Sequence, residues 1–401
     1  MFFDNISVEL ILFFILYGIT GVVPLLAALY LLLRRGNAIA PGVTPPVRLR
    51  RWAAAFFAVA ALGHVWWFLF CIYSRGVHSM DDLLHSKGYV AVVVLDCVTL
   101  LTTLAGTLLS MLQDRRRHIW PVYVAMLPYV VLGGVFIVHP SHSIPLIAIA
   151  YVLLLYVLFT VYMMFAVRRY GRWLNDNYAD LEDKKVWLSQ VVTLGCLLLF
   201  ILYTCVEIDT ILLQFLMHFT ELMLFGLLLW RVETLPNLNS FTPAPSPKGD
   251  GSDSWTSQAH SESSQDGIVA DEQYTPLTLW RGSGGEALAQ IEQLLAEHCI
   301  ATQLYLQHDL TLQQLAQTVG TNRSYLSQYF SRQGITYNTY INNLRINHFI
   351  SRCQEVAAAG QPVVAQQLAQ ESGFRSYSTF GRAFTQRTGQ SVTAWMRELG
   401  E

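Results

Sequence analysis

Long apolar runs dominate the first 235 residues and restrict the chain to few architectures. A helix that crosses a bilayer needs about 20 consecutive apolar residues, and seven runs reach this length. We therefore interpret each run as a transmembrane helix. The first run lacks a basic leader and is too long for a signal-peptide core, so we expect it to be uncleaved. The predicted spans are Ile6–Leu33, Trp52–Tyr73, Tyr89–Leu112, Ile119–Val138, Ile144–Val167, Val186–Val206 and Thr210–Trp230.

Basic residues gather in alternate loops between these runs, which predicts the orientation of the bundle. The first, third and fifth loops carry thirteen Lys and Arg residues, and the other loops carry two, Arg75 and Lys87. Loops rich in basic residues stay in the cytoplasm. The pattern therefore predicts an N-terminus outside and, after seven spans, a cytoplasmic C-terminus. The thirteen residues are Arg34, Arg35, Arg48, Arg50, Arg51, Arg115, Arg116, Arg117, Arg168, Arg169, Arg172, Lys184 and Lys185.

Ionisable residues inside the predicted spans are the candidates for a sensing site. Asp96 lies in the third span and His64 midway along the second, while His218 and Glu221 are three residues apart in the seventh and share a helix face. We single out Asp96, His218 and Glu221 as possible sensing residues. Two interpretations stay open, which are a pocket for a ligand, proton or metal, and plain hydrogen bonding between helices. Glu207 and Asp209, in the last outer turn, are weaker candidates.

No catalytic or cofactor signature occurs in this half of the chain. HExxH and GxSxG are absent, and the His218–Glu221 pair is at most half of a di-metal motif. The six cysteines form no CxxC pair. We therefore predict no catalytic residue, no cofactor and no assigned metal site, and hence a protein that is not an enzyme.

Composition changes sharply between Pro236 and Gly285. This stretch is rich in Ser, Gly, Pro and acidic residues, and no apolar periodicity survives in it. Such a composition favours a disordered cytoplasmic tether, either a plain spacer or a site of regulated cleavage. The predicted domains are thus a membrane domain at 1–235, a linker at 236–285 and a second domain at 286–401.

The stretch Leu310–Phe330 reads as two short helices about a turn. Thr311 and Asn322 are predicted helix N-caps, and Gly320 is at the position where a helix ends in a left-handed residue. Two helices joined in this way form a helix-turn-helix, whose second helix enters the DNA major groove. The apolar positions are Leu312, Leu315, Ala316 and Val319 in the first helix, and Tyr325, Leu326, Tyr329 and Phe330 in the second.

A second copy of this unit follows at Val364–Phe384. Leu368 and Ala369 repeat the apolar pattern of the first helix, Gly373 takes the place of Gly320, and Phe380 and Phe384 form the buried face of a second recognition helix. A helix around Tyr337–Ile350 connects the copies. The fold class predicted for the whole chain is therefore all-α: a polytopic seven-helix transmembrane bundle, a disordered linker, and a domain with two helix-turn-helix units.

Three segments of the second domain resemble the AraC/XylS family of bacterial transcription regulators. They are LTLQQLAQTVGTNRSYLSQYF, the Y-I-x-x-L-R motif that ends at Arg345, and L-A-x-x-S-G-F-x-S-x-S-x-F-x-R-A-F at Leu368–Phe384. The resemblance covers about residues 300–397. It implies two helix-turn-helix units that bind successive major-groove segments of promoter DNA.

Exposed residues early in each recognition helix are the predicted DNA contacts, because these positions reach base edges. Arg382 is the foremost candidate for base contact, and the family resemblance points to the same position. Arg332 and Arg387 are predicted to contact phosphate or to support the fold, and Arg345 to make an internal pair. The predicted DNA-binding residues are Arg323, Ser324, Ser327, Gln328, Arg375, Tyr377, Ser378 and Arg382.

Together these features predict a membrane-embedded one-component transcription regulator. Its partners are double-stranded promoter DNA, RNA polymerase, an unknown membrane or extracytoplasmic signal, and a second copy in a homodimer. Its location is the bacterial inner membrane. Two alternatives remain, which are a transporter or membrane enzyme with an autoregulatory DNA-binding domain, and a passive membrane anchor for a regulator.

Overall fold

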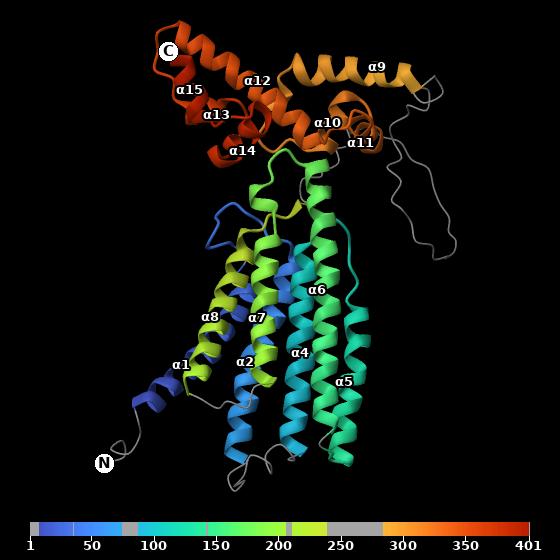
Figure 1. Cartoon of the computed structure of the whole chain (residues 1–401), viewed down its shortest axis with the longest axis vertical. Coiled ribbons are helices and arrows are strands. Elements are labelled where there is room, and N and C mark those ends of the chain that lie inside the picture. Colours follow the sequence, from blue (N-terminus) through green and yellow to red (C-terminus); the bar gives the residue numbers. More distant parts are fainter. Residues whose placement is uncertain are drawn as a thin grey trace, which may run out of the picture. The chain divides into compact units, whose positions relative to one another are not determined.

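The computed structural model describes residues 8–34, 36–73, 87–141, 143–205, 211–238 and 284–400. Within these ranges every regular element is a helix, which confirms the all-α prediction (Figure 1). The chain divides into two compact units. The first comprises 1–171 and 183–241, and the second comprises 172–182 and 242–401. Most of the predicted linker, and both Glu207 and Asp209, fall outside the described residues.

Seven helices occupy the positions of the seven predicted spans. Six of them are long and apolar enough to cross a membrane, and α7 is a shorter apolar helix over Trp187–Tyr203. The predicted count of seven spans is therefore approximate by this measure. The helices are α1 (Val8–Leu33), α2 (Val47–Tyr73), α4 (Lys87–Met111), α5 (Trp120–Val138), α6 (Ser143–Asn177), α7 (Trp187–Cys205) and α8 (Ile211–Thr234).

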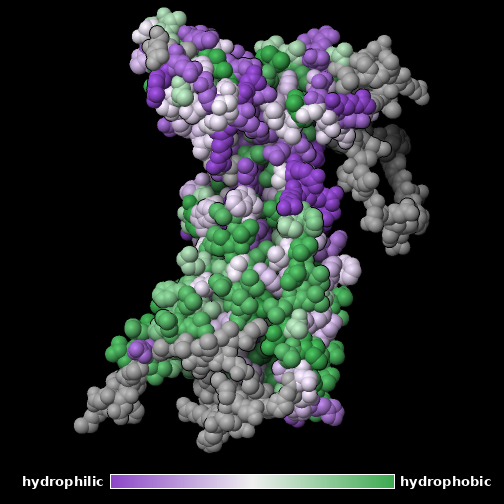
Figure 2. Space-filling view, in the orientation of Figure 1, coloured by the Kyte–Doolittle hydropathy of each residue, from purple (hydrophilic) through white to green (hydrophobic). Residues whose placement is uncertain are grey.

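Large apolar side chains cover the outside of these helices. Leu33, Leu212 and Met223 are each more than 70% exposed, and hydrophobic residues form most of the visible surface of the first unit (Figure 2). Among the described residues of the second unit, by contrast, only Ile300, Val364 and Tyr377 are exposed large hydrophobic residues. An apolar surface this extensive is consistent with a membrane domain.

Small residues allow α2 to pack closely against α1 and α4. Ala53, Ala54 and Ala60 of α2 are buried. Gly106 of α4 faces the Trp52 ring, and a Cβ atom built on this glycine comes within 2.4 Å of that ring. Close approach of backbones at small residues is the usual way that membrane helices associate.

Several loop arginines support the fold of the first unit. Arg117 is buried, and its Nη1 donates to Asp114 Oδ1 at 2.6 Å and to the Leu112 carbonyl at 3.1 Å. Arg231, at the end of α8, donates to the carbonyls of Lys185 and Asp183. Both arginines therefore hold loop backbone, and Arg117 is also one of the thirteen basic residues on which the predicted orientation depends.

The second unit contains the helices of both predicted helix-turn-helix units. The sequence did not predict its last helix, α15. The elements are α9 (Gly284–Leu295), a π-helical turn (Ala296–Ile300), a 3-10 turn (Leu304–Leu306), α10 (Leu312–Val319), α11 (Arg323–Arg332), α12 (Tyr337–Ala358), α13 (Ala365–Glu371), α14 (Tyr377–Thr388) and α15 (Val392–Gly400).

Two apolar clusters form the core of this unit, and α12 contributes to both. Ile341 of α12 belongs to the cluster built around α10 and α11. Phe349, two turns further along, belongs to the cluster built around α13, α14 and α15. The Phe349 ring centroid is 4.5 Å from that of Phe380 and 6.1 Å from that of Trp395. One helix therefore supports both copies of the repeat.

The end of α6 and the turn after it, Arg172–Glu182, also belong to the second unit. Ala179 is 1% exposed within the first apolar cluster. The Asn338 side chain of α12 donates to the carbonyls of Tyr178 and Ala179, at 3.1 and 2.5 Å. Sequence patterns had assigned this stretch to a loop and gave no sign of this packing.

Replacing the two turn glycines by alanine is expected to have unequal effects on stability. Gly320 and Gly373 both have positive φ, +77° and +88°. An L-residue in this conformation costs about 1–2 kcal/mol. A Cβ atom on Gly320 meets nothing within 4 Å, whereas one on Gly373 lies 2.7 Å from the Leu306 carbonyl oxygen. Gly373→Ala should therefore lower the free energy of unfolding more than Gly320→Ala.

Amide hydrogen exchange of the full-length chain can measure this difference, because it reports the opening free energy of each helix separately. Equal losses of opening free energy in the two variants would show that the backbone at Leu306 can move away from the added methyl group without an energetic penalty.

Candidate nucleic-acid interface

The start of the first recognition helix, α11, is determined by the N-caps of α10 and α11 and by the glycine between these helices. The Thr311 hydroxyl accepts from the Gln314 backbone N–H, and the Gln314 side chain accepts from the Thr311 N–H, which forms a capping box on α10. Gly320 then ends α10 in the left-handed conformation, and Asn322 caps α11 by accepting from the Tyr325 N–H at 2.9 Å. The predictions for Thr311, Gly320 and Asn322 are confirmed.

The apolar face of α11 is buried, and this fixes which residues face outward. Leu326 and Phe330 are 0% and 2% exposed. Of the predicted contacts, Arg323, Ser324 and Gln328 are exposed, and Ser327 is half-buried. Arg332, at the last turn of the helix, is also exposed.

The second recognition helix, α14, is fixed in the same way. Ser376 caps it by accepting from the Thr379 N–H at 3.2 Å, and both Phe380 and Phe384 are fully buried. The outward face forms a shallow open hollow along one side of the helix. Its lining is Tyr377, Ser378, Gly381, Arg382, Thr385 and Gln386.

Two members of this hollow, Thr385 and Gln386, were not predicted from the sequence. Both are exposed, and they lie three and four residues after Arg382, on the same helix face. Helical spacing from Arg382 was the signal that would have identified them. Gln386 adds an amide that can pair with adenine.

The exposed arginines differ in what surrounds them. Arg375 is 3.4 Å from Asp309 in an ion pair between exposed side chains. Arg387 Nη2 donates to Asn347 Oδ1 at 2.6 Å. Arg382 is exposed and makes no hydrogen bond or ion pair with any other described residue. Its five N–H donors are thus available to a ligand.

Arg323 lies beside the Arg172–Glu182 segment. Burial raises the pKa of the Tyr178 hydroxyl to about 12, and the positive charge of Arg323 acts in the opposite direction. The guanidinium of Arg323 is therefore close to this segment within the second unit, which distinguishes it from Arg382.

Arg345 is a structural residue. It is 1% exposed, its Nε donates to the Tyr305 carbonyl at 2.7 Å, and its Nη2 donates to the Gln307 carbonyl at 2.7 Å. The guanidinium also lies 5.7 Å from the centre of the Phe374 ring. Burial lowers the pKa of Arg345 from its usual value. Arg345 links the segment before α10 to the turn before α14.

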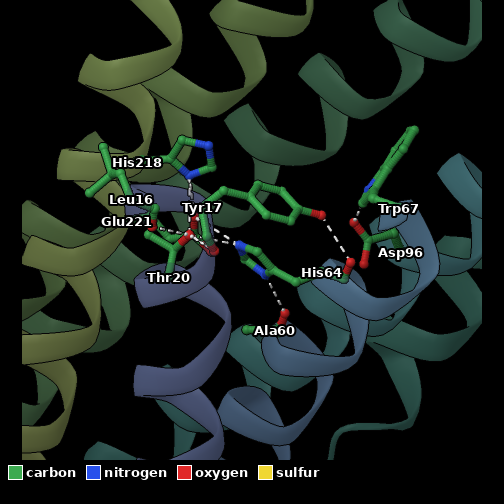
Figure 3. A network of polar contacts seen from close by, with 9 residues as sticks. All are labelled: Leu16, Tyr17, Thr20, Ala60, His64, Trp67, Asp96, His218 and Glu221. Atoms are coloured by element: carbon green, nitrogen blue, oxygen red, sulfur yellow. Dashed lines mark hydrogen bonds and ion pairs between the residues drawn. The ribbon is translucent and has the colours of Figure 1, made fainter. Parts of the chain in front are cut away.

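The possible sensing residues of the first unit separate into two groups (Figure 3). His218 Nδ1 and Glu221 Oε2 are 3.4 Å apart on α8, and His64 of α2 joins them, with its Nε2 3.9 Å from the same Glu221 oxygen. Asp96 of α4 instead accepts a hydrogen bond from Trp67 Nε1 at 3.3 Å. His64 was noted in the sequence but not selected, because helical spacing cannot show a contact between α2 and α8.

Comparison with known protein families identifies the second unit. A family model described as a helix-turn-helix domain matches residues 315–398, a range that runs from α10 to α15 and includes both recognition helices. No curated protein and no solved structure matches the chain. This family is one of DNA-binding domains and not of enzymes. Residues 315–398 thus belong to the AraC-type helix-turn-helix family, and the chain carries the DNA-binding domain of a transcription regulator beside a set of apolar helices consistent with a membrane domain.

Proposed function

We propose that the chain is a membrane-embedded one-component transcription regulator. The observation that carries the proposal is the presence of two different surfaces in one chain. The exposed face of α14, where Arg382 has no partner among the described residues, suits the DNA major groove, and the apolar surface of the first unit suits lipid. In this proposal residues 1–235 form the membrane domain, 236–285 a cytoplasmic linker and 286–401 the DNA-binding domain.

The proposed orientation has the N-terminus outside and the second unit in the cytoplasm, where DNA is. The thirteen basic residues of the odd loops support it. The proposed DNA contacts are those named from the sequence, extended by Thr385 and Gln386. RNA polymerase and a second copy of the chain are the further proposed partners.

The direct test uses inverted membrane vesicles, whose cytoplasmic face is outside, and fragments of the source genome. Full-length protein in these vesicles should retain a small set of fragments, and vesicles of the opposite orientation should retain none. Retention by both kinds of vesicle, or by neither, contradicts the proposed arrangement.

Orientation is a separate prediction with its own measurement. A reporter that is active only in the cytoplasm should be active when fused after Arg117 or after Trp230, and inactive when fused after His139 in the loop between α5 and α6. This follows because Arg115, Arg116 and Arg117 hold their loop inside. Activity after His139 would reverse the orientation and contradict a cytoplasmic DNA-binding unit.

Signal sensing by the first unit is tested by exchange of its helices. If residues 1–171 and 183–235 are replaced by an unrelated anchor with the same number of spans, and Arg172–Glu182 is kept because it packs in the second unit, DNA binding should persist while regulation by conditions outside the cell is lost. Regulation that survives the exchange would show that the first unit is an anchor alone.

A further inference from the structure

The contact between α2 and α8 brings together three side chains that commonly ligate metals. His64 Nε2, His218 Nδ1 and a carboxylate oxygen of Glu221 all lie within 4.8 Å of one another. All three residues are part of the first unit, and their side chains are between 14% and 19% exposed. Figure 3 shows the three polar ends converging, with Thr20 of α1 between the two rings.

The hydrogen bonding of His64 determines which ring nitrogen faces the cluster with a lone pair. His64 Nδ1 is 3.0 Å from the Ala60 carbonyl oxygen. A carbonyl oxygen can only accept, so Nδ1 carries the hydrogen and Nε2 of the neutral ring carries the lone pair. Histidine ligands in metal sites are commonly held in this way, with the second nitrogen bonded to a backbone carbonyl.

Thr20 lies between the two rings and has one hydrogen for several acceptors. Its hydroxyl oxygen is 2.9 Å from His64 Nε2 and 3.3 Å from His218 Nδ1, and its single hydrogen also has the Tyr17 carbonyl as an acceptor at 2.9 Å. The Glu221 carboxylate adds further acceptor oxygens. Within the described residues the basic groups near Glu221 Oε2 are the two imidazoles, at 3.4 and 3.9 Å, and with both rings neutral the carboxylate has no positive partner. A bound cation supplies the missing positive charge.

The ligand set and spacing select the kind of cation. Zn²⁺ binds imidazole nitrogen and carboxylate oxygen at about 2.0–2.1 Å, which places tetrahedral ligands about 3.3 Å apart. His218 Nδ1 and Glu221 Oε2 are 3.4 Å apart, and His64 Nε2 and Glu221 Oε2 are 3.9 Å apart. The two imidazole nitrogens lie within 4.8 Å of each other, so a movement of at most about 1.5 Å by the His64 ring completes three zinc ligands. Two imidazoles disfavour Mg²⁺ and Ca²⁺, which prefer all-oxygen sites.

We propose that His64, His218 and Glu221 form a binding site for a divalent transition metal ion, Zn²⁺, which joins α2 to α8. His64 and His218 supply one nitrogen each, Glu221 supplies one oxygen, and the fourth position is left to water or another ligand. Metal binding replaces the contacts of the two rings with Thr20, whose hydroxyl keeps the Tyr17 carbonyl as its acceptor. If the proposed function holds, zinc is also the signal that the first unit senses; this role, unlike the metal site itself, rests on the proposed function.

The test measures zinc binding by the full-length chain in lipid nanodiscs, by competition with a chromophoric chelator and without DNA. The wild type should bind one Zn²⁺ per chain. His64→Ala and His218→Ala should weaken binding by at least the ~10- to 100-fold that follows loss of a partner in the outer shell. Glu221→Gln keeps the size of the side chain and removes its charge, and it should weaken binding equally. His139→Ala removes an exposed histidine from the same unit and should have no effect.

Cobalt supplies a second readout that does not depend on variants. Co²⁺ bound to the wild type should show the visible absorption of a four-coordinate site, and Zn²⁺ should displace it. A stoichiometry that is the same in wild type and all four variants, or a Co²⁺ spectrum typical of the hydrated ion, overturns the metal site. Helical circular dichroism identifies any variant that has misfolded, and Glu221→Gln and the Co²⁺ spectrum then decide the question.

DNA retention is measured in a separate experiment, with and without Zn²⁺. Failure of the metal site and failure of the proposed function then give different results. Zinc that binds at one per chain without changing DNA retention supports the site and overturns its role as the signal. A wild type whose DNA retention depends on pH, but which binds no zinc, would have a cluster that only exchanges protons. This outcome overturns the proposal.

Discussion

Arg382→Ala is expected to weaken site-specific DNA binding strongly, with little effect on stability. The side chain is exposed on the outward face of α14 and has no partner among the described residues, so no contact within the protein is lost. A bidentate pair between arginine and guanine contributes about 1–3 kcal/mol of discrimination, which corresponds to a loss of about 10- to 100-fold in affinity for the specific site. Fluorescence anisotropy with a DNA fragment retained by the wild type measures this change.

Arg352→Ala is the matched control, because it removes the same charge from the same unit. Arg352 lies on α12 and pairs with Glu355, and its side chain is 41% exposed. Both variants should lose a similar, small part of non-specific affinity, which depends on charge. Equal losses of specific affinity in the two variants would show that Arg382 acts only through its charge and does not contact a base.

Phe380→Ala is expected to unfold the second helix-turn-helix unit. The ring is fully buried, and its centroid lies 4.5 Å from the Phe349 centroid and 5.2 Å from the Phe374 centroid. Truncation of a buried Phe to Ala costs about 3–5 kcal/mol, because apolar burial is lost and a cavity remains. The loss of stability should be confined to α13, α14 and α15. Hydrogen exchange of their amides in the full-length chain measures this loss.

Two further variants make this result specific to packing. Phe380→Leu keeps much of the buried apolar surface and should cost less than Phe380→Ala. Gln386→Ala changes an exposed residue of the same helix and should stay within about 0.5 kcal/mol of the wild type. Unchanged exchange in α13 and α15 after Phe380→Ala would contradict a common core of these helices with Phe349.

Local signals in the sequence predicted the second unit well. Thr311, Asn322 and Gly320 were identified from residue type and spacing alone, because helix caps and left-handed turns depend on a few adjacent residues. The buried faces of α11 and α14 followed from helical periodicity. The seven apolar runs correspond to seven helices for the same reason, although the apolar stretch Trp187–Tyr203 in α7 is shorter than a full span.

Contacts between distant segments could not be predicted from such signals. His64 and His218 lie 154 residues apart in the chain, and only the packing of α2 against α8 brings their nitrogens to the carboxylate of Glu221. The docking of Ala179 beside Asn338 is a second case, since a short polar loop carries no mark of its partner. Asp96 was a separate candidate from the sequence, and its hydrogen bond to Trp67 Nε1 likewise could not be predicted from helical spacing.

The most direct test of a membrane-embedded regulator is to identify the DNA bound by the full-length protein in membranes of living cells. Cells are cross-linked, membranes are separated from soluble protein, and the DNA recovered with the chain from each fraction is sequenced. A membrane-embedded regulator should give discrete promoter sites in the membrane fraction, recovered together with full-length protein. These sites should be lost in Arg382→Ala. Sites recovered only with a shorter soluble fragment, or sites that persist in Arg382→Ala, would contradict a membrane-embedded regulator that reads DNA through α14.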